Sequence, residues 1–584
     1  MSSNLPVTSK SFFLGPHGEN ADFFQQVWEE LLQKTLQHRR ETFSEDAQLS
    51  LAAPDSEQFK TVKKEIENFF TILHKEVPTF SNRYLGHMIS DVSIPALIGN
   101  VAVLFCNPNL ASKEVATVSR MFEMQAINEL AQMVGLNTEP ARGHFTSGGT
   151  VANFEAFWRA RYRFDHWLAM AAYLLEKGHT KDNMFELAHQ GWDKFDASVA
   201  QYSIETSELT ERSYVVQGPW DIANYYRDTL KREFPQPVVL VPGNKHYSWP
   251  KAANIFGLSE KAIWPTELDR FGRVSIASLK KNIERAKREQ RPIMMNVSVA
   301  GTTELGSVDP VDEVSELLEE YRQREGIHIW HHVDAAYGGY FCATFRQGAS
   351  KLPDNAQRAF AALSRVDSIT LDPHKLGFVP YACGAFLVKD ARSYSVSQIS
   401  APYLIKDESM GFPGWSTTLE GSRSATGAGA VWLSSRVLPL NADGHGAILN
   451  QTLEAKELLA KKLQQKFANI HFTAGSDTNI VSFVLAAPGN GLQEVNRVTG
   501  AIIDSFSDSP NFAISRTALN LASYASLVND VVDEWGGAMD DDHLLVIRMV
   551  VMSPYLGDSA NTEKLLDEFI AELEAFHTEA ISPS

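Results

Sequence analysis

The sequence is poor in cysteine, in long apolar runs and in net positive charge. Its 584 residues include three cysteines, Cys106, Cys342 and Cys383, which are too few and too scattered for a disulfide framework or a zinc site. The longest nearly apolar run, residues 94–105, is interrupted by polar and glycine residues and is shorter than a membrane span. We therefore expect no structural metal and a reducing, cytoplasmic location.

The charge balance argues against two classes of partner. The chain has 71 Asp and Glu against 53 Lys and Arg, a net charge of −18. Nucleic acids and anionic membranes select basic surfaces, so we expect the chain to bind neither. The first twenty residues also lack the apolar core of a signal peptide. A composition with 44% hydrophobic residues is typical of a folded globular protein, and the length indicates two or three domains.

The order of the apolar patterns predicts an α/β fold. From about residue 141, short runs rich in Val, Ile and Met alternate with helical stretches, as expected for a mainly parallel sheet. The strand-like runs are PVVLVP (237–242), PIMMNVSVAG (292–301), IHIWHHVDAAY (327–337), VDSITLDP (366–373) and GAFLVKD (384–390).

The same patterns divide the chain into three parts. Residues 20–75 have helical periodicity, and residues 1–110 are predicted to form an N-terminal helical segment used in dimerisation. Residues 111–430 are predicted to form the large α/β domain, with a helical insertion at about 158–235. Residues 431–584 combine helices with two apolar strands, which indicates a small α+β domain.

Lys375 is the first candidate for chemistry. It follows the apolar strand SITL and the polar residues Asp372, Pro373 and His374. The carboxyl ends of strands are where α/β enzymes gather active-site groups, and a lysine amine there can form an imine with an aldehyde. A single lysine is more often a solvated surface residue, so this interpretation depends on its companions.

Asp334 is the strongest companion. It ends a nearly all-apolar strand and is followed by two alanines, the second of which is Ala336. A buried carboxylate needs a cationic or hydrogen-bonding partner, and a protonated pyridinium nitrogen is such a partner. The alanines leave room for a flat ring. The alternative is an aspartate that caps the following segment.

Two further motifs complete a possible cofactor site. Ser147, Gly148, Gly149 and Thr150 directly precede a predicted helix, whose free N–H groups can bind a phosphate. An ordinary turn followed by a helix cap would explain the same residues. His246 follows the strand PVVLVP and could stack on a cofactor ring, although a lone histidine there is usually a loop residue.

Together these motifs resemble the group II amino-acid decarboxylases, a fold-type-I family that depends on pyridoxal 5′-phosphate (PLP). TSGGTVAN, NKHYSW, AGTTELGSVDPV, HVDAAYGG and DPHKLGFVPY carry the resemblance, which extends from about residue 78 to 575. RYLGHMISDVSIPALIG, LFCNPNLASKEV and LEGSRSATGAGAVW are most similar to bacterial tyrosine decarboxylases.

The resemblance implies a large domain with a seven-stranded sheet, a homodimer, and a role for each matching residue. Lys375, Asp334 and His246 would be catalytic residues that hold the cofactor. The other cofactor contacts implied are Ser147, Gly148, Gly149, Thr150, Thr302, Ala336, His374 and Ser422, the last across a dimer interface.

Three more roles follow from the resemblance. Tyr403 matches a mobile-loop tyrosine that returns a proton to the α-carbon, unless it is only a surface aromatic residue. Arg548 matches an arginine that binds a substrate carboxylate, and an arginine inside an apolar strand is unfavourable unless paired. His87 lies where tyrosine decarboxylases carry histidine and is expected to affect substrate choice, or else to be a polar residue at the rim of a dimer contact.

The predicted reaction is decarboxylation of an L-amino acid to the amine and CO₂, with an aromatic substrate such as tyrosine. Glutamate, aspartate and 2,4-diaminobutyrate are alternative substrates. Another fold-type-I reaction, such as that of a lyase, aldolase or transaminase, and a catalytically inactive homologue are the rival interpretations. An intact Lys375 and Asp334 argue against the inactive homologue.

Overall fold

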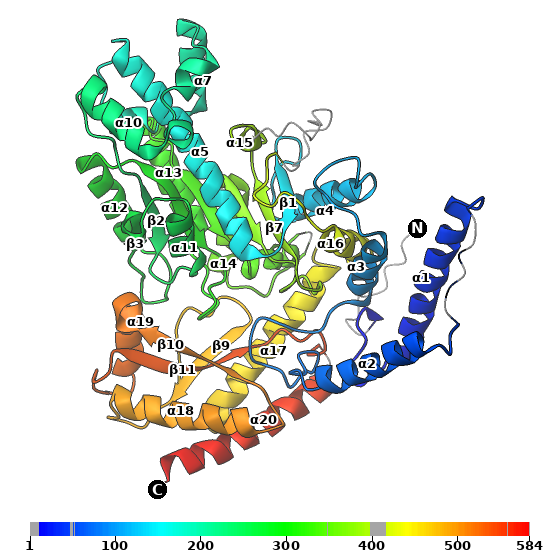
Figure 1. Ribbon diagram of the computed structural model, residues 1–584. Coiled ribbons are helices and arrows are strands. Elements are labelled where there is room, and N and C mark those ends of the chain that lie inside the picture. The colour runs from blue at the N-terminus through cyan, green and yellow to red at the C-terminus, as the bar shows by residue number, and fades with distance from the viewer. Residues whose placement is uncertain are drawn as a thin grey trace.

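The computed structural model describes residues 11–46, 49, 51, 53–346, 348–397, 416–557 and 559–582. Two sheets organise the chain, and Figure 1 shows the larger one above the smaller, with an N-terminal helical arm beside them.

The large sheet has seven strands in the spatial order β1-β7-β6-β5-β4-β2-β3. The strands are β1 (Arg142–Thr146), β2 (Val238–Pro242), β3 (Ile263–Thr266), β4 (Ile293–Val299), β5 (Trp330–Asp334), β6 (Ser368–Leu371) and β7 (Gly384–Val388). β7 runs antiparallel to its neighbours β1 and β6, and the remaining pairs are parallel. The mainly parallel sheet predicted from the alternating patterns is confirmed.

Helices cover both faces of this sheet, which is why β2, β4, β5, β6 and β7 are buried along their whole length. Along β7, Ala385 and Leu387 pack into the core on one face, while Phe386 and Val388 pack into the core on the other. The first core includes α4 (Ser119–Met133), α14 (Asp354–Ala361), α16 (Thr426–Val437) and α17 (His445–Lys466). The second includes α5 (Gly149–Glu176) and α11 (Ser248–Ile255).

The region around 158–235 is helical, but its first helix is part of the main fold. α5 runs unbroken through residue 158 and crosses the sheet, so the predicted start of an insertion lies inside this core helix. The helices that follow are α6 (Met184–Leu187), α7 (Gly191–Tyr202), α8 (Thr206–Thr210), α9 (Tyr214–Gln217), α10 (Pro219–Tyr225) and the π-helix Tyr226–Leu230. α12 (Ile276–Arg288) and α13 (Val311–Glu325) pack beside β2 and β4.

The C-terminal part forms a second, antiparallel sheet in the order β10-β11-β9-β8. Its strands are β8 (Ile470–Phe472), β9 (Ile480–Leu485), β10 (Ser515–Asn520) and β11 (His543–Val550). α17, α18 (Leu492–Asp508) and α20 (Ser559–Ile581) share one core with it, and α19 (Leu521–Asp533) shares another. Residue 431, the predicted domain boundary, falls inside α16.

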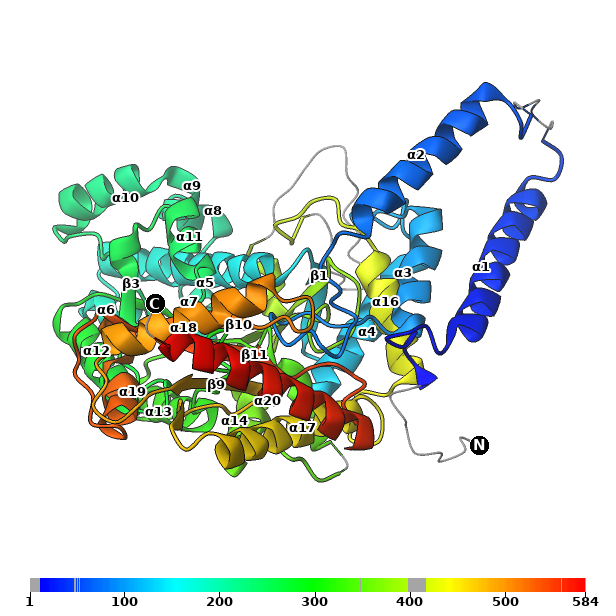
Figure 2. The same ribbon diagram turned by 90° about the horizontal axis from the view of Figure 1, so that it is seen from below.

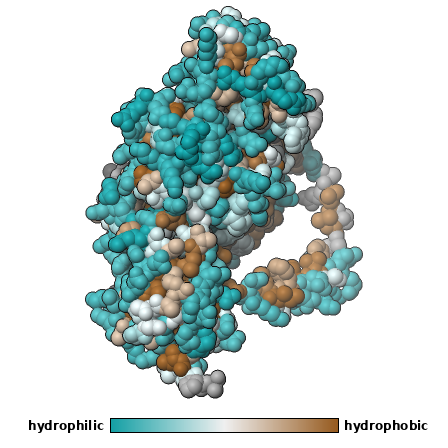
Figure 3. Space-filling model, turned by 90° about the vertical axis from the view of Figure 1, so that its left-hand side faces the viewer, coloured by the Kyte–Doolittle hydropathy of each residue, from teal (hydrophilic) through white to brown (hydrophobic). Residues whose placement is uncertain are grey.

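The N-terminal helices α1 (Ala21–Thr42) and α2 (Glu57–Leu73) bury no residue within one chain. They form an arm that stands away from the body, and Figure 3 shows apolar side chains along it. Figure 2 shows the same arm from below. α3 (Ile94–Cys106) instead packs closely on α16, where a Cβ at Gly99 would lie 2.5 Å from the Gly429 carbonyl oxygen. No helix in the described part of the chain is long and apolar enough to span a bilayer.

Candidate active site

A cavity of about 760 Å³ opens at the carboxyl ends of the parallel strands. This is the edge of an open α/β sheet where ligands bind, because the loops that follow the strands meet there. Twelve residues predicted from the sequence line the cavity: His87, Ser147, Gly148, Gly149, Thr150, His246, Thr302, Asp334, Ala336, His374, Lys375 and Arg548.

A second cavity, of about 890 Å³, lies at the opposite edge, near the amino ends of β5 and β6. It is lined by Arg163, Trp167, Trp192 and Asp367 among others, and by no residue that follows the carboxyl end of a parallel strand. We therefore assign the chemistry to the smaller cavity, where an amine, a buried carboxylate and a helix N-terminus meet.

Lys375 lies in the loop after β6 and forms an ion pair with a residue three positions before it. Its Nζ is 3.0 Å from Oδ2 of Asp372, whose other oxygen, Oδ1, is buried without a partner among the described residues. Burial alone would raise the pKa of Asp372, but the Lys375 ammonium and the hydrogen bond from His374 outweigh it and lower that pKa. Asp372 therefore stays charged and holds the Lys375 amine in the cavity.

Asp334, at the end of β5, is buried with 6% of its surface exposed. Asn153 on α5 donates a hydrogen bond of 2.7 Å from Nδ2 to Oδ2 of Asp334. The backbone N–H of Ala336 donates to Oδ1 at the longer distance of 3.3 Å. The carboxylate is thus fixed in direction while one oxygen keeps capacity for another donor from the cavity.

His246 follows β2 and is held by the same polar network. Its Nδ1 lies 2.9 Å from the hydroxyl of Ser248, and that hydroxyl accepts a hydrogen bond of 3.0 Å from Asn153 Nδ2. The Ser248 backbone N–H also donates to Nδ1, so Nδ1 acts as an acceptor. Burial lowers the pKa of His246, and this outweighs the nearby Asp334 carboxylate, which raises it, so the ring is neutral and suited to stacking.

The loop after β1 leads directly into the N-terminus of α5. α5 begins at Gly149, so its first N–H groups face the cavity without intrahelical acceptors. A Cβ at Gly149 would lie 2.8 Å from Asp372 Oδ2, and a Cβ at Gly384 would lie 2.6 Å from the Gly148 carbonyl carbon. Only glycine leaves this helix end open to a phosphate.

Arg548 on β11 reaches the cavity from the small sheet. The residue is 1% exposed, and its Nη1 donates to Ser515 Oγ at 3.0 Å and to the Gly86 carbonyl at 3.4 Å. Its Nε and Nη2 are buried without a partner in the described part of the chain. Burial lowers the pKa of Arg548, although Tyr337 and Glu304 counteract it. A buried guanidinium with free donors is a strong binding site for a carboxylate.

The remaining predicted residues are arranged around these groups. His374 accepts a hydrogen bond of 3.1 Å from the Cys383 N–H and stacks on Tyr381 with ring centroids 3.9 Å apart. Thr302 Oγ1 accepts from the Ser307 N–H at 3.1 Å. His87 is exposed at the cavity rim, where burial of part of its ring and the nearby Arg548 lower its pKa.

Two predicted residues do not join the cavity in one chain. Ser422 is exposed and accepts a hydrogen bond of 3.0 Å from Asn109 Nδ2, and it is absent from the cavity lining. Tyr403 lies outside the described residues.

Four residues of this region were missed in the sequence: Asn153, Ser248, Asp372 and Lys245. Asn153 was detectable, because it is a polar residue within the TSGGTVAN motif on the buried side of α5. Lys245 is a second lysine in the cavity, next to His246 in the sequence, and burial lowers its pKa. Its distance in sequence from Lys375 gave no sign that the two share a cavity.

These groups fit pyridoxal 5′-phosphate. The cavity offers an amine for the aldehyde, a buried carboxylate for the ring nitrogen and a helix N-terminus for the phosphate. It also offers the Arg548 guanidinium, whose Nε and Nη2 have no partner among the described residues, for a carboxylate. The fold and this set of groups define the class as the fold-type-I PLP enzymes.

Comparisons with known proteins narrow the class. A family model described as the pyridoxal-dependent decarboxylase conserved domain matches residues 226–486. The L-tyrosine decarboxylase of Levilactobacillus brevis is 27% identical over 94% of this chain and 93% of its own length. The aspartate 1-decarboxylase of Aliivibrio fischeri is 26% identical over 68% of this chain and 62% of its own length.

A solved structure agrees in fold. The crystal structure of Catharanthus roseus tryptophan decarboxylase in complex with L-tryptophan superimposes with a TM-score of 0.62 at 15% identity, covering 95% of this chain and 99% of that one. The chain matches the pyridoxal-dependent decarboxylase domain over residues 226–486, and it is a PLP-dependent amino-acid decarboxylase.

Proposed function

We propose that the chain converts an aromatic L-amino acid, with tyrosine as the first candidate, to the amine and CO₂. The observation that carries this proposal is the buried Arg548, whose Nε and Nη2 are unpaired in the cavity that also holds Lys375 and Asp334. Its place fits an α-carboxylate at the mouth of a PLP site. The resemblance to the Levilactobacillus enzyme supports tyrosine as substrate.

Each residue has a stated task in the proposed reaction. When bound, PLP supplies an electron sink that makes loss of CO₂ from the α-carbon possible. Lys375 would hold the cofactor through its aldehyde, and Asp334 would keep a proton on the ring nitrogen. His246 and Ala336 would contact the ring, and the N-terminus of α5, with Ser147 to Thr150, would bind the phosphate.

The other proposed tasks concern the substrate and the second proton. Arg548 would bind the α-carboxylate and fix the orientation of the substrate in the cavity. Tyr403 then donates a proton to the α-carbon and excludes water. Thr302 and His374 line the cofactor space, and we assign them contacts with the ring and the phosphate.

The walls of the cavity support an aromatic side chain. Met88, Ile89, Tyr247, Tyr337 and Tyr381 line it and offer apolar and aromatic surface. His87 stands at the rim with a lowered pKa, so it is neutral near pH 7 and could hydrogen-bond a phenol hydroxyl.

Lys245 favours a second candidate, an acidic amino acid. It is a cation of the same cavity besides Arg548 and Lys375, so it could pair with a side-chain carboxylate. The experiment that decides is release of labelled CO₂ from carboxyl-labelled tyrosine, phenylalanine, aspartate, glutamate and 2,4-diaminobutyrate. We expect turnover of tyrosine to be preferred. Preference for aspartate or glutamate, abolished by Lys245→Met but retained in His87→Gln, would replace the aromatic assignment.

We also propose a cytoplasmic homodimer. The arm exposes apolar side chains that a single chain leaves in water. They include Phe23, Leu36, Phe59, Val62, Ile66, Phe69, Phe70 and Ile72. A second copy would cover them, and would also bring Ser422 to a neighbouring phosphate site. Sedimentation of a fully active 64.9 kDa monomer would contradict the dimer.

A further inference from the structure

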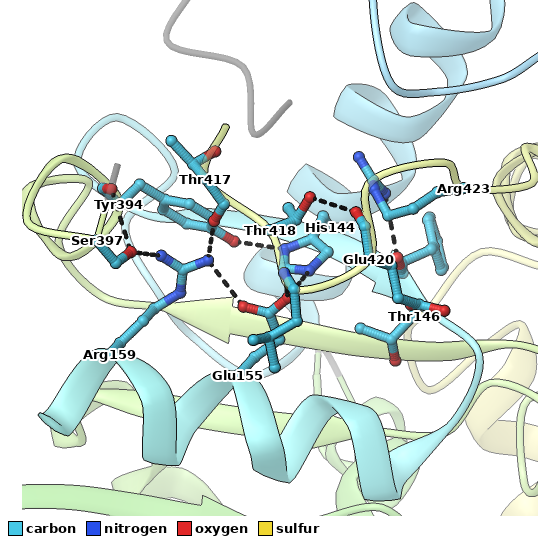
Figure 4. Close-up of polar contacts among 12 residues, drawn as sticks. His144, Thr146, Glu155, Arg159, Tyr394, Ser397, Thr417, Thr418, Glu420 and Arg423 are labelled. Atoms are coloured by element: carbon cyan, nitrogen blue, oxygen red, sulfur yellow. Dashed lines mark hydrogen bonds and ion pairs between the residues drawn. The ribbon is translucent and has the colours of Figure 1, made fainter. Parts of the chain in front are cut away.

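Glu155 and Arg159 form a fully buried ion pair one turn apart on α5. Arg159 Nη2 lies 2.9 Å from Glu155 Oε2, and both side chains have no exposed surface. Removing two charges from water is unfavourable unless further hydrogen bonds compensate. The compensating bonds lead to two segments far away in the sequence, as Figure 4 shows.

Arg159 contacts both of these segments. Its Nη1 donates to the Ser393 carbonyl at 3.2 Å and to Ser397 Oγ at 2.8 Å. Its Nη2 donates to the Thr417 carbonyl, and its guanidinium lies over the ring of Tyr394 at 3.8 Å from the centroid. One side chain thus holds residues before position 398 and after position 415 together.

Glu155 binds the second segment independently. Its Oε1 accepts a hydrogen bond of 2.7 Å from the Leu419 N–H, and lies 3.1 Å from His144 Nε2. His144 Nδ1 in turn lies 2.8 Å from the Tyr394 hydroxyl. Because the carboxylate requires a donor, Nε2 carries the His144 proton and Nδ1 accepts from Tyr394.

Electrostatics keep the pair ionised. Burial lowers the pKa of His144, so this ring is neutral and leaves the carboxylate to balance the charge of Arg159. Burial alone would raise the pKa of Glu155, but His144, Arg159 and the Leu419 N–H outweigh it and lower that pKa. Glu155 is therefore the charged partner of the Arg159 guanidinium.

The same helix begins at the phosphate-binding end of the cavity. Glu155 is six residues from Gly149, which corresponds to roughly 9 Å along the axis of a helix. Glu420, next to Leu419, accepts a hydrogen bond of 3.3 Å from the Ser147 N–H. We call residues 393–397 and 416–420 the two anchored segments. Because α5 binds both of them and begins at the cavity, this helix connects the anchored segments to the cofactor site.

We propose that Glu155 and Arg159 are positioning residues for the protonation step, because they fix the two chain segments between which Tyr403 lies in the sequence. The inference rests on the proposed function, in which Tyr403 returns a proton to the α-carbon. A pair that only stabilised the fold would lower the amount of active enzyme without changing the products.

The products distinguish the two roles. When the α-carbon receives the proton, each CO₂ is matched by one amine. A proton that goes to the cofactor side instead, followed by hydrolysis by one water molecule, releases an aldehyde and leaves the amino group on the cofactor. The ratio of amine to aldehyde per CO₂ therefore reports the position of the proton donor and is independent of the fraction of folded enzyme.

The test compares Arg159→Gln with Arg163→Gln. Arg163 lies one turn further along α5 and is also buried, but it donates to the Met294 carbonyl at 2.8 Å and, among the described residues, makes no hydrogen bond or ion pair with either anchored segment. We expect the amine-to-aldehyde ratio to fall about tenfold or more in Arg159→Gln, toward that of Tyr403→Phe, and to stay at the wild-type value in Arg163→Gln. Ser397→Ala, which removes one of the two hydrogen bonds donated by Arg159 Nη1, should shift the ratio less in the same direction.

A second readout uses the protein without cofactor. Amide hydrogen exchange in peptides covering 389–397 and 416–424 should become faster in Arg159→Gln and Glu155→Gln, and not in Arg163→Gln. Unchanged exchange and an unchanged product ratio in both Arg159→Gln and Ser397→Ala would overturn the inference. A wild-type enzyme that forms no amine would instead overturn the proposed function, while the exchange experiment would still test the anchoring.

Discussion

Asn153 donates a hydrogen bond of 2.7 Å from Nδ2 to Oδ2 of Asp334. The direction of this amide is fixed, because its Oδ1 accepts from the Thr370 hydroxyl at 2.8 Å and its Nδ2 also donates to Ser248. α5, which begins at the phosphate end of the cavity, therefore also orients the carboxylate at the ring end and, through Ser248, His246.

Replacing Asp334 by Asn should separate binding from catalysis. The amide keeps the size and most contacts of the carboxylate but cannot hold a proton on the ring nitrogen. We expect PLP to remain bound and kcat/KM to fall about 10²-fold or more. Cofactor content by absorbance and steady-state rates measure the two effects. Activity within a few-fold of wild type would contradict the role of Asp334.

Asn153→Ala should lower kcat/KM less than Asp334→Asn does. It removes one hydrogen bond to a charged group, which is worth about 1.5–3 kcal/mol and corresponds to roughly a 10- to 100-fold lower kcat/KM. Ser248→Ala, which leaves the Asp334 bond in place, is the matched control and should affect activity less. Equal losses in the two variants would argue that the effect acts through His246 rather than Asp334.

Arg548→Gln should weaken binding of the amino-acid substrate more than binding of the amine product. Loss of the buried cation removes the partner of the α-carboxylate. The resulting decrease in kcat/KM should correspond to about 2–5 kcal/mol of lost transition-state stabilisation. The amine product has no carboxylate, so its dissociation constant should change little. Calorimetry with amino acid and amine measures both ligands. A matching loss of affinity for the amine would show that the cavity itself had collapsed.

The stability of the cofactor-free protein should decrease in mild acid. Burial lowers the pKa values of His189 and His445 to about 4, and those of His331 and His332 to about 3, from 6.5 in the unfolded chain. The unfolded chain therefore binds more protons below pH 6.5, and each histidine subtracts at most about 1.4 kcal/mol per pH unit as the pH falls through this window.

One buried carboxyl acts in the opposite direction. Burial raises the pKa of Asp309 to about 7, so the folded state gains a proton there as the pH falls and offsets about one histidine. Urea unfolding at pH 7 and pH 4.5 should thus give a lower free energy of unfolding at pH 4.5. An equal or higher value would contradict the neutral state of these histidines.

The sequence allowed prediction of the fold class, and of most residues around the cavity, because each candidate follows an apolar strand and parallel strands end at one edge. Asp334, His246 and Lys375 were predicted on that basis. Glu155 and Arg159 were not, because the loop segments that they bind lie 234 to 264 residues away and nothing local marks which polar side chains of a helix are buried. The exposed arm was predicted to be helical, but periodicity alone does not show what covers its apolar face.

We expect Lys375 to carry the cofactor, and Lys245 is the rival because both lysines line the cavity. Borohydride reduction of the PLP-loaded protein fixes the cofactor on the lysine that binds it and blocks tryptic cleavage there. The account predicts an uncleaved peptide of residues 366–389 with the added mass of the reduced cofactor, and no such adduct in Lys375→Ala. An adduct on a peptide that contains Lys245, with the 366–389 region cleaved normally at Lys375, would contradict it.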